Sequence, residues 1–491
     1  MKKEKIKNIW HKYQKVLLLS FFFFLFCYGI KLFTYSYSLD TEAFMIYRES
    51  FLNSWLQLNR FSLVALKEIF SFIPFNIILT NWITVIIFFF ASLLTYYNLA
   101  RIYLKMKSPK KALLFLMILG SSPIFLEQFN FTLQSAEIAI FLLLFQLGVL
   151  SLEKYFEKNK ISYLICTIFI ESLCLGAYQS FAPLFITEIL IILLLKIENK
   201  EITIQKSIIK YIATVCGAFI ISFILYVILS KLILELSGLS SSTYLNSQIA
   251  WISKPFFENC INILKSIAMM YFSFGYLRNS YFQYTLLNFF VLLLGIIMSI
   301  KKVKEKKYFL SILCLAILAS PLLMTFLLGN HEPVRAQFAL PIVLAFFPIY
   351  TWKEQKWFSV TLLILIFGQV FTMWTLQYND YLRFENDKIM AKEIYEEVKE
   401  YLPNRKLVFV GAKDSDNKGN IKVRGEAMGI SFFNHYGLSD RATTFMKTLG
   451  YPIEDDRSYI SEATETVKNL EAYPSKNSIY INDTYVIVKL S

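Results

Sequence analysis

The feature of this sequence that most limits its fold is a series of apolar runs, each long enough to cross a lipid bilayer. A membrane-spanning helix needs ~20 predominantly apolar residues, more than the core of a soluble protein demands of one segment. Of the 491 residues, 56% are hydrophobic, which agrees with a chain that lies mostly in lipid. We therefore predict an α-helical polytopic membrane protein.

We expect about eleven transmembrane helices by this criterion of length. The apolar runs centre on residues 17–33, 77–99, 112–125, 136–152, 163–177, 181–195, 208–234, 284–300, 309–328, 338–350 and 358–376. The first run follows a basic leader and has no small-residue cleavage site after it, so we interpret it as an uncleaved signal anchor. The fifth and sixth runs lie close enough together to form a re-entrant pair instead of two spans.

The net charge of +14 raises the question whether the cations bind nucleic acid or act as topology signals. Lys and Arg concentrate in alternate segments, at residues 1–15, 101–111, 153–160, 196–210, 301–307 and 353–356. The positive-inside rule places the N-terminus and these loops in the cytoplasm, and the intervening loops and the tail outside. We expect membrane lipids, and no nucleic acid, as partners.

The composition changes at about residue 380, where charged residues increase and apolar runs shorten to the length of strands. Strand-like runs are "KLVFV" at 406–410, "SIYI" at 478–481 and "YVIVKL" at 485–490, and helical patterns cover 387–401 and 429–449. We predict two domains, a polytopic transmembrane domain at residues 1–379 and a small extracytoplasmic α/β domain at residues 380–491.

Two carboxylates stand directly after the first apolar run, in "SLDTEAF". If this loop is extended, Asp40 and Glu42 point to the same side, because side chains alternate along an extended chain. Such a carboxylate can act as general base on a hydroxyl that attacks a sugar carbon. A phosphate leaving group would need cations, and Arg48 and Arg60 suit it because guanidinium binds phosphate with two hydrogen bonds. A solvated loop with incidental salt bridges would have the same composition.

Two further outer turns carry candidate binding residues. The loop "GNHEPVRAQF" holds His331, Glu332 and Arg335. The first two are adjacent candidate ligands, a pattern too weak to predict a metal site. Arg335 begins a span, where an arginine either reaches lipid headgroups or binds a lipid phosphate. The turn "LGAYQSF" holds Tyr178, a residue common at membrane interfaces, and Gln179, whose amide needs partners.

The order of these features resembles that of the bacterial glucosyltransferase II family, membrane enzymes of the GT-C group that modify O-antigens and related surface glycans. The resemblance rests on the acids in "LDTEAF", on Trp55 and "NRF" later in the same loop, on the turn in "LCLGAYQSF", and on the ending "AYPSKNSIYINDTYVIVKL". It covers nearly the whole chain, although each motif is short.

The sequence departs from the family pattern in two places. The family's acids are adjacent, and here Thr41 separates them, so either Asp40 or Glu42 could be the base; we favour Asp40. Gln134 stands where a second acid would be expected, and Glu127 is the acid that could substitute for it.

The resemblance implies a GT-C-like inverting hexosyltransferase in the bacterial plasma membrane, with the active site in the transmembrane domain and with no cofactor and no metal. Its donor would be a hexose, glucose in this family, on polyprenyl phosphate at the outer leaflet, and its acceptor a surface glycan. The candidate donor- or substrate-binding residues are Arg48, Arg60, Glu127, Tyr178, Gln179, His331 and Arg335.

Two other functions are compatible with this topology, a carrier or flippase for lipid-linked saccharides and a polysaccharide polymerase with a polyprenyl-pyrophosphate donor. A transporter should have ionisable residues in the middle of its spans. Here those positions are apolar apart from Glu137, Glu171 and Glu188, which favours the enzyme.

Overall fold

The computed structural model describes residues 2–202, 205–242, 249–272, 283–414 and 425–491. Contacts divide the chain into two compact units. Unit 1 comprises Met1–Phe33, Asn53–Phe129 and Gln134–Trp374, and unit 2 comprises Thr34–Leu52, Asn130–Leu133 and Thr375–Ser491. Residues 375–491 are called the C-terminal region below.

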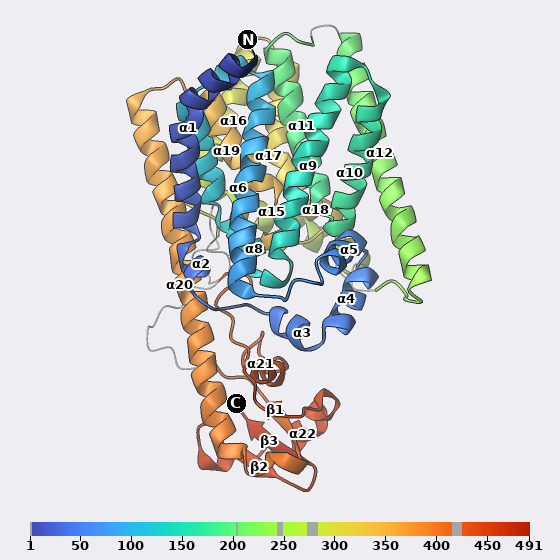
Figure 1. The fold of residues 1–491 in the computed structure, drawn as a ribbon, viewed down its shortest axis with the longest axis vertical. Coiled ribbons are helices and arrows are strands. Elements are labelled where there is room, and N and C mark those ends of the chain that lie inside the picture. The colour runs from blue at the N-terminus through green and yellow to red at the C-terminus, as the bar shows by residue number, and fades with distance from the viewer. Residues whose placement is uncertain (1, 203–204, 243–248, 273–282, 415–424) are drawn as a thin grey trace. The chain divides into compact units, whose positions relative to one another are not determined.

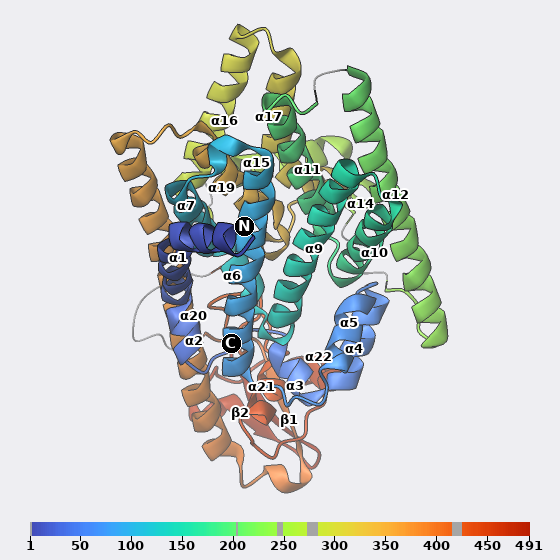
Figure 2. The ribbon, with the colours of Figure 1, turned by 45° about the horizontal axis from the view of Figure 1, so that its top comes forward.

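Unit 1 is built from helices (Figure 1). Those that lie wholly or mostly in it are α1 (Lys2–Cys27), α2 (Gly29–Phe33), α5 (Phe61–Ile69), α6 (Ile77–Ile102), α7 (Pro109–Gly120), α8 (Pro123–Asn130), α9 (Thr132–Lys158), α10 (Ile161–Ala177), α11 (Phe181–Glu198), α12 (Gln205–Leu236), α14 (Ala250–Ser253), α15 (Phe256–Phe272), α16 (Leu286–Lys304), α17 (Tyr308–Ala319), α18 (Leu323–Leu328) and α19 (Ala339–Thr351). Helix α10 packs against α12, α16 against α17, and α7 against both α1 and α19 (Figure 2). The residues of α4 (Arg48–Gln57) and α20 (Lys356–Val398) divide between the two units.

Six of the described helices are long and apolar enough to cross a membrane, and there are seven if the bent pair α7 and α8, which meet at 45°, is one span. The six are Ile77–Ile102, Thr132–Lys158, Lys206–Leu236, Leu286–Lys304, Tyr308–Leu328 and Lys356–Val398. The predicted runs at 163–177 and 338–350 form shorter apolar helices, α10 of 17 residues and α19 of 13 residues. A multi-pass protein is therefore confirmed, and the count of eleven spans stays a prediction.

Helix α20 is one continuous helix of 43 residues. The sequence suggested a span at 358–376 and a separate helix at 387–401, because hydropathy falls sharply between them. Backbone hydrogen bonds of a helix do not depend on side-chain polarity, so the polar stretch continues the apolar one. The division into domains 1–379 and 380–491 stays a prediction.

The C-terminal region contains a small mixed sheet. Its strands are β1 (Lys406–Val410), β2 (Ile479–Ile481) and β3 (Tyr485–Lys489), in the order β1-β3-β2. Strands β1 and β3 are parallel and pair Val408 with Ile487, whereas β2 and β3 are antiparallel. Helix α22 (Ile460–Thr466) packs on β1, and its Ala463 is buried with Val408 and Ile487 in one apolar cluster. The three predicted strands are confirmed.

The predicted helix at 429–449 is wrong except for its end, α21 (Ala442–Thr448). Gly429 has a left-handed backbone with φ 75°. Its N–H donates to Asp380 Oδ1 at 2.8 Å, and the N–H of Phe432 donates to Asp387 Oδ2 at 2.9 Å. These carboxylates of α20 take the place of helical carbonyl acceptors, so the apolar residues here pack without forming a helix.

Candidate active site

Asp40 and Glu42 converge on one guanidinium in unit 2, that of Arg441. One terminal nitrogen of Arg441 donates to Asp40 Oδ1 and the other donates to Glu42 Oε1, both at 2.6 Å. Asp40 has a left-handed backbone with φ 74° and precedes α3 (Thr41–Ile46), whose first turn holds Glu42. The segment is not extended, and a left-handed residue before a short helix brings the acids together instead. Aspartate adopts this conformation more readily than most residues do.

The two acids differ in burial. The Glu42 side chain is 1% exposed and the Asp40 side chain is 35% exposed. Burial raises the pKa of Glu42 to about 7, although Arg441 opposes the shift. The second carboxylate oxygen of Glu42 has no hydrogen-bond partner among the described residues. Asp40 is thus the acid that solvent reaches, and Glu42 is the acid that holds a proton near neutral pH.

Contacts within unit 2 fix the segment that carries the acids. The ring of Tyr37 packs against Phe384 and Phe445, with centroids 4.8 Å and 6.2 Å apart. Further along the segment, Lys447 donates to the Tyr47 hydroxyl at 2.9 Å. The acids therefore stand between two points at which residues 34–52 are anchored to the C-terminal region.

Of the two arginines predicted to bind phosphate, Arg48 belongs to unit 2 and Arg60 to unit 1. Arg48 is the first residue of α4, and its side chain is half-buried. Arg60 precedes α5, and its guanidinium carbon lies 4.6 Å from the centroid of the Tyr178 ring. No carboxylate of the described residues forms an ion pair with Arg60, and its Nε has no hydrogen-bond partner among them. A stacked guanidinium of this kind keeps its terminal N–H groups for an anion.

The turns that place Arg60 and Tyr178 have clear local causes. Asn59, with φ 60°, ends α4 in the left-handed conformation, and the N–H of Arg60 then donates to the carbonyl of Trp55 at 2.9 Å. The amide of Gln179 donates to the carbonyl of Leu58 and to the hydroxyl of Tyr226, each at 3.1 Å. The partners that Gln179 was expected to need thus tie the two turns together.

Gly176, the glycine of "LGAYQ", allows α5 to approach α10. A β-carbon at this position would lie 2.5 Å from the Phe61 ring and 2.7 Å from Ser62 Oγ. Real β-carbons are not found so close to other atoms, so a larger residue would push the two helices apart.

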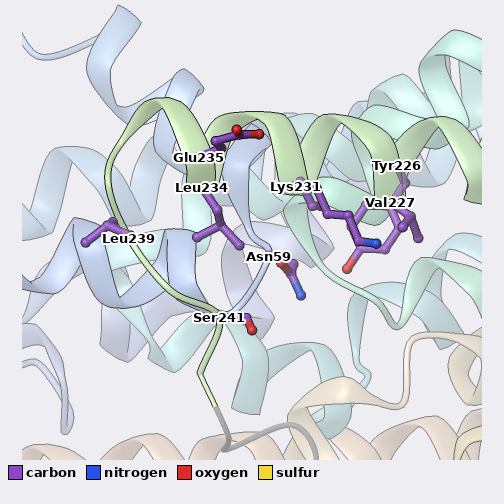
Figure 3. Close-up of a pocket in the computed structure, with 9 residues that line it drawn as sticks. Asn59, Tyr226, Val227, Lys231, Leu234, Glu235, Leu239 and Ser241 are labelled. Atoms are coloured by element: carbon purple, nitrogen blue, oxygen red, sulfur yellow. The ribbon is translucent and has the colours of Figure 1, made fainter.

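A pocket of about 410 Å³ opens beside these turns. Figure 3 shows α12 along one side of it, with Asn59 and Ser241 across from the helix. Its lining residues are Asn59, Tyr226, Val227, Ser230, Lys231, Leu234, Glu235, Leu239 and Ser241. The pocket shares Asn59 with the turn that carries Arg60, and it shares Tyr226 with the hydrogen bond of Gln179.

The loop predicted to contain His331, Glu332 and Arg335 also belongs to unit 1. Glu332 is buried and accepts a hydrogen bond from Ser180, next to the Tyr178 turn, at 3.4 Å. Burial lowers the pKa of His331 to about 4, so its imidazole is neutral at pH 7. Arg335 lies half-buried in a single 3₁₀ turn (Val334–Ala336).

Glu127 is fully buried in α8 and accepts a hydrogen bond from Gln283 at 2.7 Å. Gln134, the residue found in place of a second acid, is buried as well. Across the described part of the chain, no group of three or more His, Cys, Asp or Glu side chains could hold a metal ion.

Sequence reasoning missed Arg441 and Tyr226. Arg441 is 399 residues away from Glu42 in the chain, and nothing in its surroundings marks it as a partner of the acids. Tyr226 lies in an apolar run, where a tyrosine with a buried ring is unremarkable. A signal was available only for Gln179, whose amide required partners that the sequence did not name.

The apolar helices of spanning length define a multi-pass membrane protein. It has two candidate sites, the pair of carboxylates bonded to Arg441 and the guanidinium of Arg60 on the Tyr178 ring. The model of the family described as Glucosyl transferase GtrII matches residues 13–352 of the chain. The protein therefore belongs to this family and is a glucosyltransferase of the membrane, with a sugar donor and an acceptor as substrates. No curated protein and no solved structure matches the chain. The matched region contains Asp40, Glu42 and Arg60 but ends before Arg441.

Proposed function

We propose that this protein transfers glucose from a polyprenyl-phosphate donor to a polysaccharide of the cell surface, on the outer side of the bacterial plasma membrane. The family supplies the class of reaction. The proposal retains a GT-C-like architecture of about eleven spans, a cytoplasmic N-terminus, and the domains 1–379 and 380–491. The two candidate sites support it, because one offers a base and the other a cation for a phosphate.

The proposed reaction is a single displacement at the anomeric carbon. A hydroxyl oxygen of the acceptor forms a bond to C1 of the glucose while the bond from C1 to the phosphate oxygen breaks. The electron pair of that bond leaves with polyprenyl phosphate, and the hydroxyl proton passes to a carboxylate. Attack opposite the leaving group inverts the anomeric centre. A guanidinium that hydrogen-bonds the phosphate stabilises the charge that develops on it.

Asp40 is the proposed base, and the observation that carries this choice is the difference in exposure within the acid pair. Asp40 is 35% exposed, whereas Glu42 is 1% exposed. A base must come within hydrogen-bond reach of the hydroxyl that it deprotonates, and the exposed carboxylate of Asp40 is more accessible to a hydroxyl than that of Glu42. Glu42 therefore contributes to the catalytic pair by binding Arg441, the arginine that also bonds Asp40.

Arg60 is the first candidate for the donor phosphate, because no carboxylate of the described residues neutralises it. Tyr178 supports its guanidinium, and Gln179 fixes the turn behind it. Arg48 and Arg335 are further proposed phosphate or headgroup contacts. His331 and Glu127 complete the proposed binding residues, His331 as a neutral hydrogen-bonding group and Glu127 as a buried acceptor.

The test is glucose transfer by the purified full-length protein in lipid nanodiscs, with polyprenyl-phosphate glucose and the lipid-linked glycan as substrates. Asp40→Asn keeps the side-chain shape and removes the base, so the rate should fall by ~10²- to 10⁴-fold. Asp483→Asn changes an exposed acid of the same unit and should leave the rate unchanged. Full activity of the Asp40 variant would show that the base is wrong, and no transfer by the natural protein would show that the donor or acceptor is wrong.

The alternatives give different results in the same assay. A carrier would move the lipid-linked sugar without transferring it, and a polymerase would change glycan chain length in a deletion strain rather than remove a side branch. The intramembrane acids do not favour a carrier, because two of them are occupied in the structure. Glu137 pairs with Lys67 at 2.8 Å, and Glu188 accepts a hydrogen bond from Gln146 at 2.5 Å.

A further inference from the structure

The contact of Arg441 with Asp40 and Glu42 differs from an ordinary surface ion pair. The Arg441 side chain is 19% exposed, and each of its terminal nitrogens donates to a different acid at 2.6 Å. Exposed ion pairs usually contribute little because water screens them, whereas short charge-assisted bonds to a buried carboxylate are strong. One side chain thus fixes the distance and the orientation between the two carboxylates.

The charges of the cluster require this cation. Above the pKa of Glu42 both carboxylates are ionised and repel each other, and a single guanidinium then leaves a net charge of −1 on the group. Without Arg441, the buried oxygen Glu42 Oε1 would lose the side-chain donor that it has now. An unpaired buried carboxylate is strongly destabilised, so the acids would separate or take up a proton.

The backbone that carries Arg441 is well packed. Arg441 precedes α21, and the next turn of that helix contributes Ala442, Phe445 and Met446, all fully buried in the C-terminal region. The Phe445 ring stacks on Phe432 with centroids 4.2 Å apart. The backbone that presents Arg441 is therefore held by a packed apolar core and not by a loose loop.

We infer that Arg441 is the positioning residue of the acid pair and that the C-terminal region thereby completes the site at which the acceptor hydroxyl is deprotonated. The inference rests on the proposed role of Asp40 as base. In this role Arg441 acts through Asp40, by holding its carboxylate in a fixed orientation. Because the family match ends at residue 352, this function comes from a part of the chain that the family model does not cover.

Other titratable groups face the cluster and define what the test must separate. Tyr37 lies close enough to interact electrostatically with Glu42, and Asp440 does so with Arg441 while it also contacts His435 at 3.4 Å. None of these three side chains is a cation bonded to Asp40 or Glu42. Loss of Arg441 therefore removes the cation that Asp40 and Glu42 share.

The experiment compares Arg441→Gln and Arg441→Lys with Arg457→Gln in the full-length protein in nanodiscs. Arg457 is a matched arginine of the same region that pairs with Asp455, not with the acid pair. For Arg441→Gln we expect a fall in kcat of ~100-fold, as for a misplaced catalytic group. Lysine should restore part of kcat, since its point charge serves one acid but not both, and Arg457→Gln should match the natural protein.

A second measurement does not depend on the donor or the reaction. In thermal unfolding, Asp40→Asn and Arg441→Gln should be non-additive, with the double variant losing no more than the larger single loss. Additive losses, or a fall in kcat that lysine does not partly restore, would overturn the inference. If the natural protein transfers no glucose but the unfolding losses are non-additive, the proposed function fails while the link between Arg441 and the acid pair stands.

Discussion

The two best-placed arginines of this glucosyltransferase are held in opposite ways. Arg441 gives both of its terminal nitrogens to carboxylates, whereas Arg60 lies on the face of a tyrosine ring and pairs with no described carboxylate. A guanidinium that is already bonded to two acids has its charge neutralised and its N–H groups occupied. A guanidinium on an aromatic face keeps its charge and its N–H groups available for a ligand.

This difference assigns two separate roles to arginines, phosphate binding and the orientation of a general base, which the sequence alone did not distinguish. A phosphate needs a cation with free donors, and a general base needs a fixed and ionised carboxylate. Arg60 suits the first task and Arg441 the second. The variants below exchange or weaken these two arrangements, and their effects should differ accordingly.

The largest effect in this series should come from Arg60→Gln, which removes the open cation. Hydrogen bonds to charged groups contribute ~1.5–3 kcal/mol, so kcat/KM for the polyprenyl-phosphate donor should fall by about 10- to 150-fold. The KM of the acceptor should change little, which is the mark of a donor-phosphate role. Arg101→Gln is the matched control, since Arg101 of the same unit already pairs with Glu157. An equal loss in both variants would remove the distinction between open and paired arginines.

Much of the Arg60 site could be predicted from the sequence, and the Arg441 contact could not. Arg60, Tyr178 and Gln179 were grouped because alternating basic loops placed their turns on one side of the membrane. Arg441 is 399 residues from Glu42 in the chain, and no local pattern connects them. The orientation of Asp40 was also out of reach, because its left-handed backbone follows from the packing around it.

The fold was predictable where side-chain pattern and backbone agree. Long apolar runs gave the multi-pass architecture, and short apolar runs gave the strands of the small sheet. Pattern failed at α20, where one helix of 43 residues crosses a sharp change in polarity. It failed again at 429–441, where Asp380 and Asp387 supply acceptors that no periodicity shows.

A second prediction breaks the Arg60 arrangement without touching its charge. Gly176→Val places a side chain where the Phe61 ring lies 2.5 Å away, so α5 must move from α10 and take Arg60 off Tyr178. Overpacking of this kind costs about 1–3 kcal/mol of folding stability. The displaced guanidinium should also lose its hydrogen bond to the donor phosphate, so we expect kcat/KM to fall by about 10-fold or more. Gly217→Val, in a helix interior with nothing within 4 Å of the added carbon, controls for valine in a helix. Matching losses of donor affinity in the two variants would contradict the close approach.

A third prediction weakens the Arg441 cluster through its buried acid. The pKa of Glu42 is raised by burial from 4.5 to about 7, so the folded protein holds this proton more tightly than the unfolded chain does. Glu42 therefore stabilises the fold fully below about pH 4.5, and this contribution is lost as the pH rises to about 7. The difference amounts to on the order of 3 kcal/mol.

Glu42→Gln imitates the protonated acid at every pH and should remove that dependence. The unfolding temperature of the variant relative to the natural protein should therefore rise between pH 4.5 and pH 7. Glu49→Gln, an exposed acid on the same segment, is the control and should follow the natural protein. A Glu42 variant that keeps the natural pH dependence would show that another group carries the proton.

The smallest effect should come from the ring beneath Arg60, and it tests why that arginine stays open. Tyr178→Phe keeps an aromatic face and should bind the donor as the natural protein does, whereas Tyr178→Leu removes the attraction between cation and ring. That attraction contributes about 0.5–1 kcal/mol at a partly exposed site, which corresponds to a rise of about 2- to 5-fold in the donor KM. Equal losses in the two variants would assign the effect to the hydroxyl rather than the ring. If only leucine weakens donor binding, Arg60 depends on the aromatic ring, which attracts the cation without occupying its N–H groups. The carboxylates bonded to Arg441 attract a cation too, but they occupy those groups.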